Sequence, residues 1–276
     1  MAIVHKNALL KVEHLSIGFS QYVKGTRKRI IHPIADMNVE IGEGEIVAVV
    51  GASGSGKSLL AHAVLGILPG NAICGGKIIY RGEVLTEQAK ERLRGREISF
   101  IPQSVNYLDP LMRVGRQVQI GLDKKLARKK QEELFLQYGL HTSDGKLFPF
   151  ELSGGMLRRV LFATSVREGV KLVIADEPTP GIHPQALAEI LGQLKQFAAD
   201  GAGVMFITHD IVSALEVADR VAVIKDGTTV EIADAAAFAE SGELLQTEYT
   251  RRLWRALPHN DFEAELKQKE GGRAWH

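Results

Sequence analysis

The sequence contains a single cysteine, Cys74, among 276 residues. No internal disulfide is therefore possible, which suits a reducing compartment. The sequence also lacks an excess of charge of one sign, since 34 Lys and Arg against 33 Asp and Glu leave a formal net charge of +1. Proteins that bind nucleic acid usually carry a basic bias, so this balance gives no support for a nucleic-acid partner, and we expect none.

Long apolar runs are missing as well. No stretch approaches the roughly 18 apolar residues that suggest a membrane-spanning helix. The first residues, MAIVHKNALLKVEH, lack the basic and apolar regions of a signal peptide. We therefore expect that, if the protein serves a membrane, it does so as a peripheral protein at the cytoplasmic face. Repeats and low-complexity tracts are also missing, and the hydrophobic content of 45% is ordinary for a globular protein.

The sequence does contain a glycine-rich motif between two apolar runs. Its letters, GASGSGKS at residues 51–58, match the phosphate-binding P-loop, G-x-x-x-x-G-K-[ST], at every specified position. The run 45–50 before it predicts a buried strand, and the run 59–68 after it predicts an apolar helix, which is the context that this loop requires. Glycines let the backbone wrap around a phosphate chain, while Lys57 would reach the β- and γ-phosphates and Ser58 would hold Mg²⁺. The motif alone leaves a kinase, a GTPase, a helicase and a transport ATPase open.

A second candidate site is an apolar run that ends in two carboxylates. The run LVIADE, residues 172–177, predicts a buried strand with Asp176 at its C-terminal end, where α/β sheets bind ligands. Asp176 could bind the Mg²⁺ held by Ser58, and Glu177 could orient a water for attack on the γ-phosphate. The alternative is a pair that caps the next loop. The presence of a P-loop in the same chain favours the metal-binding interpretation.

Apolar strand patterns alternate with helical patterns along most of the chain. The predicted strands are residues 9–19, 34–41, 45–50, 77–80, 97–101, 171–176, 203–208 and 220–225, and the predicted helices are residues 59–68, 114–121, 124–138, 185–199 and 211–218. Residues 21–29 read as a hairpin loop with solvated charges, residues 103–151 as a helical insertion, and the chain from Asp234 as one or two helices. This order predicts a mainly parallel sheet covered on both faces, with an antiparallel part at its entrance.

A third motif narrows the class of protein. The run LSGGM, residues 152–156, is followed by two arginines and resembles the signature sequence of ATP-binding cassette (ABC) ATPases. The order of motifs agrees with that resemblance: the P-loop, Gln103 in FIPQ, the signature, LVIADEP, and ITHD with His209. The resemblance covers roughly residues 8–258. Apart from the resemblance, Ser153 can cap a helix, and the two glycines after it let a phosphate approach the backbone.

The resemblance implies a fold and a division of the chain. The fold is α/β, with a P-loop NTPase (RecA-like) core, an antiparallel β subdomain and an inserted α-helical subdomain. One ABC ATPase domain would span residues 1–258, with residues 1–103 and 165–235 as the α/β core and β subdomain, 104–164 as the helical subdomain and 236–258 as C-terminal helices. The charged tail, residues 259–276, is expected to be poorly ordered.

The resemblance also implies ATP and Mg²⁺ as cofactors and a role for each motif. The implied ATP-binding residues are Phe19, Gly51, Ala52, Ser53, Gly54, Ser55, Gly56, Lys57, Ser58 and Leu59. The signature residues Leu152, Ser153, Gly154, Gly155 and Met156 would face an ATP molecule held by the P-loop of a second subunit. The implied catalytic residues are Lys57, Gln103, Glu177 and His209, and the implied Mg²⁺ ligands are Ser58, Gln103 and Asp176. Phe19 is the first choice for stacking on adenine, Tyr22 is the alternative, and core burial is a competing explanation for Phe19.

Two further stretches resemble the dipeptide, oligopeptide and nickel importer branch of the family. They are LDPLMRVG at residues 108–115 and YTRRLWRALP at residues 249–258. This branch implies a second ABC ATPase subunit (a paralogue or the same chain), two transmembrane permease subunits contacted through residues 104–115, and an extracytoplasmic solute-binding protein. Because Cys74 is the only cysteine, no iron–sulfur cluster is expected. A peptide, nickel and a metal chelate remain open as the cargo.

One residue departs from the family pattern. His183 stands in the loop after Glu177, where the family usually carries an aspartate, and that loop normally communicates between the two ATP sites. The change puts symmetric coupling of the two sites in doubt. A regulatory, weakly hydrolysing cassette in an asymmetric heterodimer is therefore kept as one alternative to an importer subunit. An ABC ATPase without a permease is kept as a second alternative.

Overall fold

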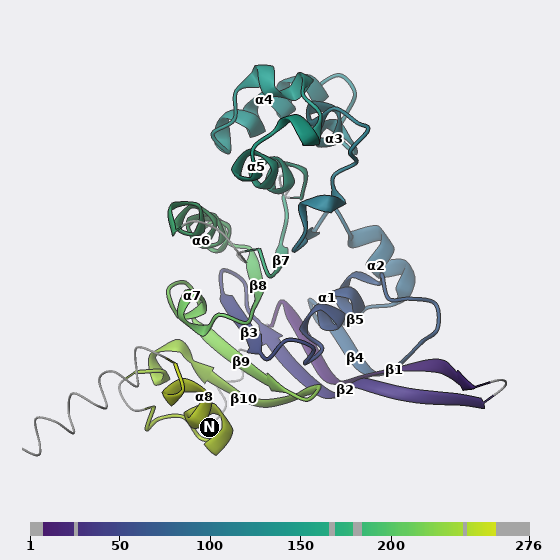
Figure 1. Cartoon of the computed structure of the whole chain (residues 1–276), viewed down its shortest axis with the longest axis vertical. Coiled ribbons are helices and arrows are strands. Elements are labelled where there is room, and N and C mark those ends of the chain that lie inside the picture. The colour runs from purple at the N-terminus through teal and green to yellow at the C-terminus, as the bar shows by residue number, and fades with distance from the viewer. Residues whose placement is uncertain (1–7, 25–26, 166–168, 179–183, 240–241, 258–276) are drawn as a thin grey trace, which may run out of the picture.

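The computed structural model describes residues 8–24, 27–165, 169–178, 184–239 and 242–257. The strands of this part form one 10-stranded sheet in the order β5-β4-β1-β2-β10-β9-β3-β8-β7-β6. Their bounds are β1 (Leu10–Lys24), β2 (Arg27–Ile41), β3 (Ile46–Gly51), β4 (Ala72–Tyr80), β5 (Glu83–Val84), β6 (Ile98–Ile101), β7 (Leu172–Asp176), β8 (Gly203–Thr208), β9 (Arg220–Lys225) and β10 (Thr228–Asp234). Figure 1 shows this sheet running from β1, β2 and β10 at the base of the molecule up to β8 and β7 below the helical lobe.

Helices cover the sheet and form a separate lobe. The α-helices are α1 (Lys57–Leu65), α2 (Glu87–Leu93), α3 (Val114–Gln119), α4 (Ala127–Gln137), α5 (Gly154–Ser165), α6 (Pro184–Ala199), α7 (Ile211–Leu215) and α8 (Glu248–Arg255). Short 3₁₀ turns lie at Val105–Tyr107, Thr142–Lys146, Pro149–Glu151 and Ala235–Ala237. Figure 1 places α3, α4 and α5 together in a lobe that projects from the sheet, while α6 and α7 lie on the opposite side of β3 from α1 and α2.

The parallel half of the sheet carries the P-loop. Strands β6, β7, β8, β3 and β9 pair in parallel, and every residue of β3, β7 and β8 is buried. Continuous burial is typical of strands covered on both faces. Alternate residues of β3 therefore enter two apolar clusters, with Ala48 and Val50 in one and Val47 and Val49 in the other. The prediction of a mainly parallel sheet covered on both faces is confirmed.

The antiparallel half differs from its prediction in two respects. β1 pairs with β2, as expected, and also with β4, a pairing that was not predicted. The two strands of the β1–β2 hairpin include residues 21–24 and 27–29, most of the stretch predicted as a loop. Gln21 pairs with Arg29 and Lys24 with Arg27, so the prediction of a loop over this whole stretch is wrong. Backbone hydrogen bonds between two strands do not depend on side-chain polarity, so charged residues can pair as strands without the apolar alternation that pattern analysis detects.

Other differences concern helix ends and elements that were not predicted. α1 ends at Leu65 instead of residue 68, because Gly66 adopts a left-handed conformation with φ of 66°. Strands β5 and β10 and helix α2 were not predicted. The buried residues of α4 are Ala127, Gln131 and Phe135, spaced by four. All of the regular elements described between β6 and β7 are α-helices or 3₁₀ turns, as predicted. Within the described ranges, no helix is both long and apolar enough to span a membrane.

Candidate active site

The P-loop is held at the end of β3 by close packing. Gly54 and Gly56 have φ values of 80° and 95°, a region that favours glycine. A Cβ atom at Gly51 would lie 2.3 Å from the carbonyl oxygen of Ile224 on β9, and one at Gly56 would lie 2.9 Å from Cγ1 of Ile34 on β2. Both distances are too short for a real side chain. Contacts with β9 and β2 therefore require glycine at these positions.

Lys57, the first residue of α1, lies inside this loop and is only 4% exposed. Its Nζ donates hydrogen bonds to the carbonyl oxygens of Gly51 at 2.9 Å and Ala52 at 3.0 Å. Burial lowers the pKa of Lys57, while the charges of Glu177 and Asp176 act in the opposite direction. The ammonium group is thus poorly solvated and held by carbonyl groups, and an anionic phosphate would compensate its charge.

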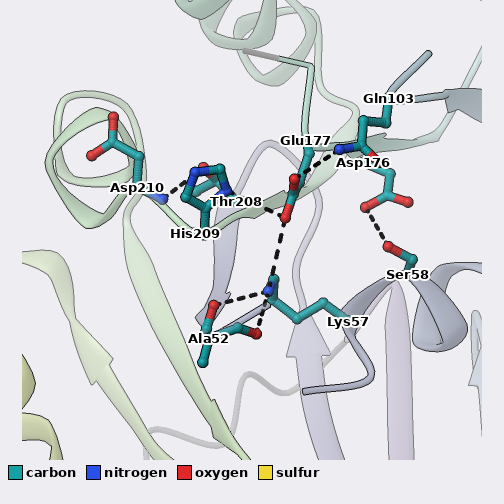
Figure 2. Close-up of polar contacts among 10 residues, drawn as sticks. Ala52, Lys57, Ser58, Gln103, Asp176, Glu177, Thr208, His209 and Asp210 are labelled. Carbon is teal, nitrogen blue, oxygen red and sulfur yellow. Dashed lines mark hydrogen bonds and ion pairs between the residues drawn. The ribbon is translucent and has the colours of Figure 1, made fainter. Parts of the chain in front are cut away.

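Ser58 and Asp176 form the next part of the site. Ser58 Oγ donates a hydrogen bond of 3.1 Å to Oδ1 of Asp176, which ends the buried strand β7 (Figure 2). Burial raises the pKa of Asp176, and the hydrogen bond from Ser58 opposes that shift. The two hard oxygen donors beside a phosphate-binding loop fit Mg²⁺, which protein sites usually bind through one or two carboxylates plus substrate phosphates. Among the described residues, no group of three or more His, Cys, Asp and Glu could hold a metal ion.

Glu177 lies where the other polar side chains meet (Figure 2). Its Oε2 accepts a hydrogen bond of 3.0 Å from Nε2 of Gln103, and its Oε1 lies 3.4 Å from Nδ1 of His209 and 3.9 Å from Nζ of Lys57. The backbone of Glu177 has φ of 41°, which is uncommon for a residue with a side chain. Its amide donates a 2.8 Å hydrogen bond to the carbonyl oxygen of Ile207 on β8. The carboxylate is therefore placed by contacts from several elements.

His209 occupies the turn between β8 and α7. The turn is fixed by Asp210, whose amide donates to Thr208 Oγ1 at 3.0 Å and whose Oδ1 accepts from the amide of Val212 at 3.0 Å as the N-cap of α7. The side chain of His209 is 55% exposed to solvent, and its Nδ1 atom contacts the carboxylate of Glu177. His209 can therefore reach both the carboxylate and a ligand that enters from solvent.

The signature residues lie outside this constellation. Ser153 Oγ accepts a hydrogen bond of 3.3 Å from the amide of Met156 and thus caps α5, as predicted. Nothing lies within 4 Å of the position of a Cβ at Gly154 or Gly155, so their backbone is open to a ligand. None of the hydrogen bonds or ion pairs described for the P-loop site involves residues 152–156, and Figure 1 places α5 in the helical lobe. The structure does not bring the two glycine motifs of one chain together.

The predicted adenine site is only partly described. Phe19 is half-buried, packs against the apolar cluster on the α1 side of the sheet, and pairs in register with Ile31 and Ala72. Its role in stacking on adenine stays a prediction. The side chain of Tyr22 and all of His183 lie outside the described residues.

One wall of the site was not predicted from the sequence. A pocket of about 360 Å³ lies beside the P-loop and Glu177. It is lined by Gly51, Ala52, Ser53, Glu177, His209, Ile211, Tyr249 and Leu253. The last two residues lie on α8, four positions apart and therefore on one face of that helix. Nζ of Lys225 lies 4.7 Å from the centre of the Tyr249 ring, a cation–π contact. The spacing of Tyr249 and Leu253 was visible in the sequence, but nothing local indicated which element this face would meet.

This fold and this set of side chains define a P-loop ATPase cassette. Residues 34–180 match the ABC transporter family. The chain is similar to the oligopeptide transport ATP-binding proteins OppD of Bacillus subtilis (34% identity over 83% of this chain and 67% of that protein) and Escherichia coli (33%, over 83% and 70%). It is 36% identical to the peptidoglycan transport ATP-binding protein YejF of Agrobacterium fabrum over 92% of this chain, but spans only 48% of that protein.

Solved structures agree with these sequence relatives. A dimeric post-hydrolysis state of the ATP-binding cassette MJ0796, bound to ADP and Pi, aligns with a TM-score of 0.69 and 26% identity over 82% of this chain and 98% of that one. A second dimeric structure of MJ0796, a bacterial ABC transporter cassette, aligns with the same TM-score at 25% identity. The chain therefore belongs to the ABC transporter family and is an ATP hydrolase. The family and the fold predicted from the motifs are confirmed.

Proposed function

We propose that this chain is the ATP-hydrolysing subunit of an importer for a peptide-class substrate. The observation that carries the proposal is the meeting of Lys57, Gln103 and His209 at Glu177, beside the Ser58–Asp176 pair. Relatives named for oligopeptide and peptidoglycan transport support a peptide over nickel or a metal chelate as the cargo. The subunit would act at the cytoplasmic face of a membrane with two permease subunits, a second ATPase subunit and an extracytoplasmic solute-binding protein.

The chemistry follows from the positions of the side chains. The backbone N–H groups of residues 51–58 and the ammonium of Lys57 would bind the phosphates. Glu177 would accept a hydrogen bond from the attacking water and orient it, with Gln103 and His209 fixing the carboxylate. His209, half-exposed, would also contact the γ-phosphate. Each group acts on charge that develops during phosphoryl transfer, which is where electrostatic stabilisation is most effective.

The metal site uses groups that are already in place. Ser58 and Asp176 would hold Mg²⁺ together with the phosphates, and the amide oxygen of Gln103 is available because its nitrogen donates to Glu177. Mg²⁺, when bound with ATP, supplies positive charge that offsets the phosphate oxygens. The buried setting of Asp176 strengthens that attraction, since charges interact more strongly away from water.

A second cassette would complete each ATP site. The open backbone at Gly154 and Gly155, together with the start of α5, would form an anion site for the ATP of a second subunit. Two subunits arranged head to tail would each place this signature against the other's ATP. The dimeric structures of MJ0796 support such a pair. Binding of ATP would close the two cassettes, and hydrolysis would let them open.

The segment after Gln103 would pass this motion to a permease. It includes Tyr107 and Leu111, which are 64% and 85% exposed. Both side chains are accessible to a permease subunit. Gln103 itself bonds Glu177, so the segment begins at the catalytic centre. The cargo need not touch this chain.

The test is the change Glu177→Gln, with Glu216→Gln on the exposed end of α7 as the matched control. We expect Glu177→Gln to lower ATP turnover by about 10²- to 10⁴-fold, the usual contribution of a general base. Sedimentation of the variant with Mg-ATP should show a dimer, with itself or with a paralogue, whereas the control should turn over ATP normally. Unchanged turnover, or a monomer with every candidate partner, would contradict the proposal. Stimulation of the reconstituted transporter by peptide but not by Ni²⁺ would support the assigned cargo.

A further inference from the structure

Two neighbouring arginines on α5 have different partners. Arg159 forms a two-pronged ion pair with Glu189 on α6, with N–O distances of 2.8 to 3.2 Å, and donates to the carbonyl oxygen of Gly139 at 3.2 Å. Arg158 instead donates a hydrogen bond from its guanidinium to the carbonyl oxygen of Pro178. Arg158 thus contacts the residue that follows Glu177, whereas Arg159 links α5 to α6 and to the end of α4.

Pro178 follows directly after Glu177, and the backbone there is unusual. Glu177 has φ of 41°, and a proline after it normally favours an extended conformation at the preceding residue. A side-chain-bearing residue persists in this region only when its surroundings hold it there. The amide of Glu177 is held by Ile207 at 2.8 Å on one side. On the C-terminal side of Glu177, the hydrogen bond from Arg158 holds the carbonyl group of Pro178.

We propose that Arg158 is a positioning residue for Glu177, holding the backbone around it through Pro178. This inference rests on the proposed role of Glu177 in hydrolysis. The bond is a charge-assisted one, and such bonds are stronger and more directional than neutral ones. Burial lowers the pKa of Arg158, but a guanidinium remains protonated at neutral pH. Arg158 therefore acts as a constant donor.

The same residue connects two functional elements. Ser153 caps α5, and Arg158 lies on this helix five positions further along. An α-helix moves as a rigid unit over such a distance. A phosphate bound at Gly154 and Gly155 would be linked through α5 and the Arg158 bond to Pro178 and Glu177. The signature and the water-positioning carboxylate of one chain would thereby respond to each other.

The test is a set of substitutions assayed by single-turnover ATP hydrolysis with the full chain in excess over ATP. Arg158→Met should lower the rate of hydrolysis by about ten- to a hundredfold, since small misplacements of a catalytic group have effects of this size. The dissociation constant for a fluorescent ATP analogue should stay within about twofold, because the P-loop is untouched. Arg158→Lys, which keeps a charged donor, should recover part of the rate. Arg159→Met is the matched control and should lower thermal stability while the rate stays within about twofold.

A double-mutant cycle separates positioning from a general structural effect. In a Glu177→Gln background, Arg158→Met should lower the rate by less than about twofold, because the group it positions is already inactive. Equal losses in both backgrounds, or an unchanged rate for Arg158→Met and Arg158→Lys in the wild-type background, would overturn the inference. If Glu177→Gln alone leaves the rate unchanged, the proposed function fails as well. If only Glu177→Gln has an effect, the proposed function stands and the role of Arg158 does not.

Discussion

Replacing Lys57 by methionine removes the buried ammonium but keeps the length and volume of its side chain. In the protein without ATP, two effects oppose each other. The carbonyl oxygens of Gly51 and Ala52 lose a donor, while a poorly solvated charge is also lost, as the lowered pKa of Lys57 indicates. We therefore expect the free energy of unfolding without ATP to change by less than about 1 kcal/mol.

The effect should appear when ATP is present. Charge-assisted hydrogen bonds contribute about 1.5–3 kcal/mol, so the loss of Lys57 should weaken ATP binding by roughly 10- to 150-fold. At an ATP concentration of about 100 times the wild-type dissociation constant, ligand binding stabilises the wild type by about 2.7 kcal/mol. A variant that binds about 100-fold more weakly gains only about 0.4 kcal/mol. For a chain of this size, the Tm shift would fall from about 5–10 °C to about 1 °C.

Thermal unfolding with and without Mg-ATP measures both quantities. Lys129→Met is the matched control, because Lys129 is exposed on α4 and pairs only with its neighbour Glu133 among the contacts described. It should keep the full ATP-induced shift. A full shift for Lys57→Met would refute the assignment of Lys57 to the phosphates. A loss of many degrees without ATP would show that Lys57 mainly supports the loop.

Two further predictions concern the metal and the C-terminal helix. Asp176→Asn should raise the Mg²⁺ concentration for half-maximal hydrolysis by more than about tenfold, as a carboxylate ligand becomes neutral; an unchanged Mg²⁺ titration would argue against this ligand. Burial would raise the pKa of Glu231, but bonds from Gln246 and Thr247 outweigh it and lower that pKa below 4.5. The carboxylate therefore stabilises the fold above about pH 4.5, and Glu231→Gln should cost about 1–2 kcal/mol at pH 7. Urea unfolding at several pH values measures this difference in the free energy of unfolding between wild type and variant, which should shrink as the pH falls below 4.5. A difference that stays constant with pH would contradict the prediction.

The sequence by itself determined the parts of the site that are local. The P-loop needs only consecutive residues, because its glycines set the backbone and the following helix begins at Lys57. Asp176 could likewise be placed at a strand end from the apolar run before it. That Gln103 and His209 belong to the ATP site came from a family resemblance, since no local pattern relates residues so far apart in the chain. Their contacts with Glu177 came from the structure.

Only the tertiary structure decided the contacts between distant segments. Arg158 meets Pro178, and α8 lines the pocket with Tyr249, because of how helices pack on the sheet. Residues 21–24 and 27–29 lie in paired strands although their charges resemble a loop, since backbone hydrogen bonds between two strands do not depend on side-chain polarity. Local sequence patterns are sufficient to predict helices, buried strands and the P-loop. Contacts between distant segments depend on how the whole chain packs, and local patterns do not predict them.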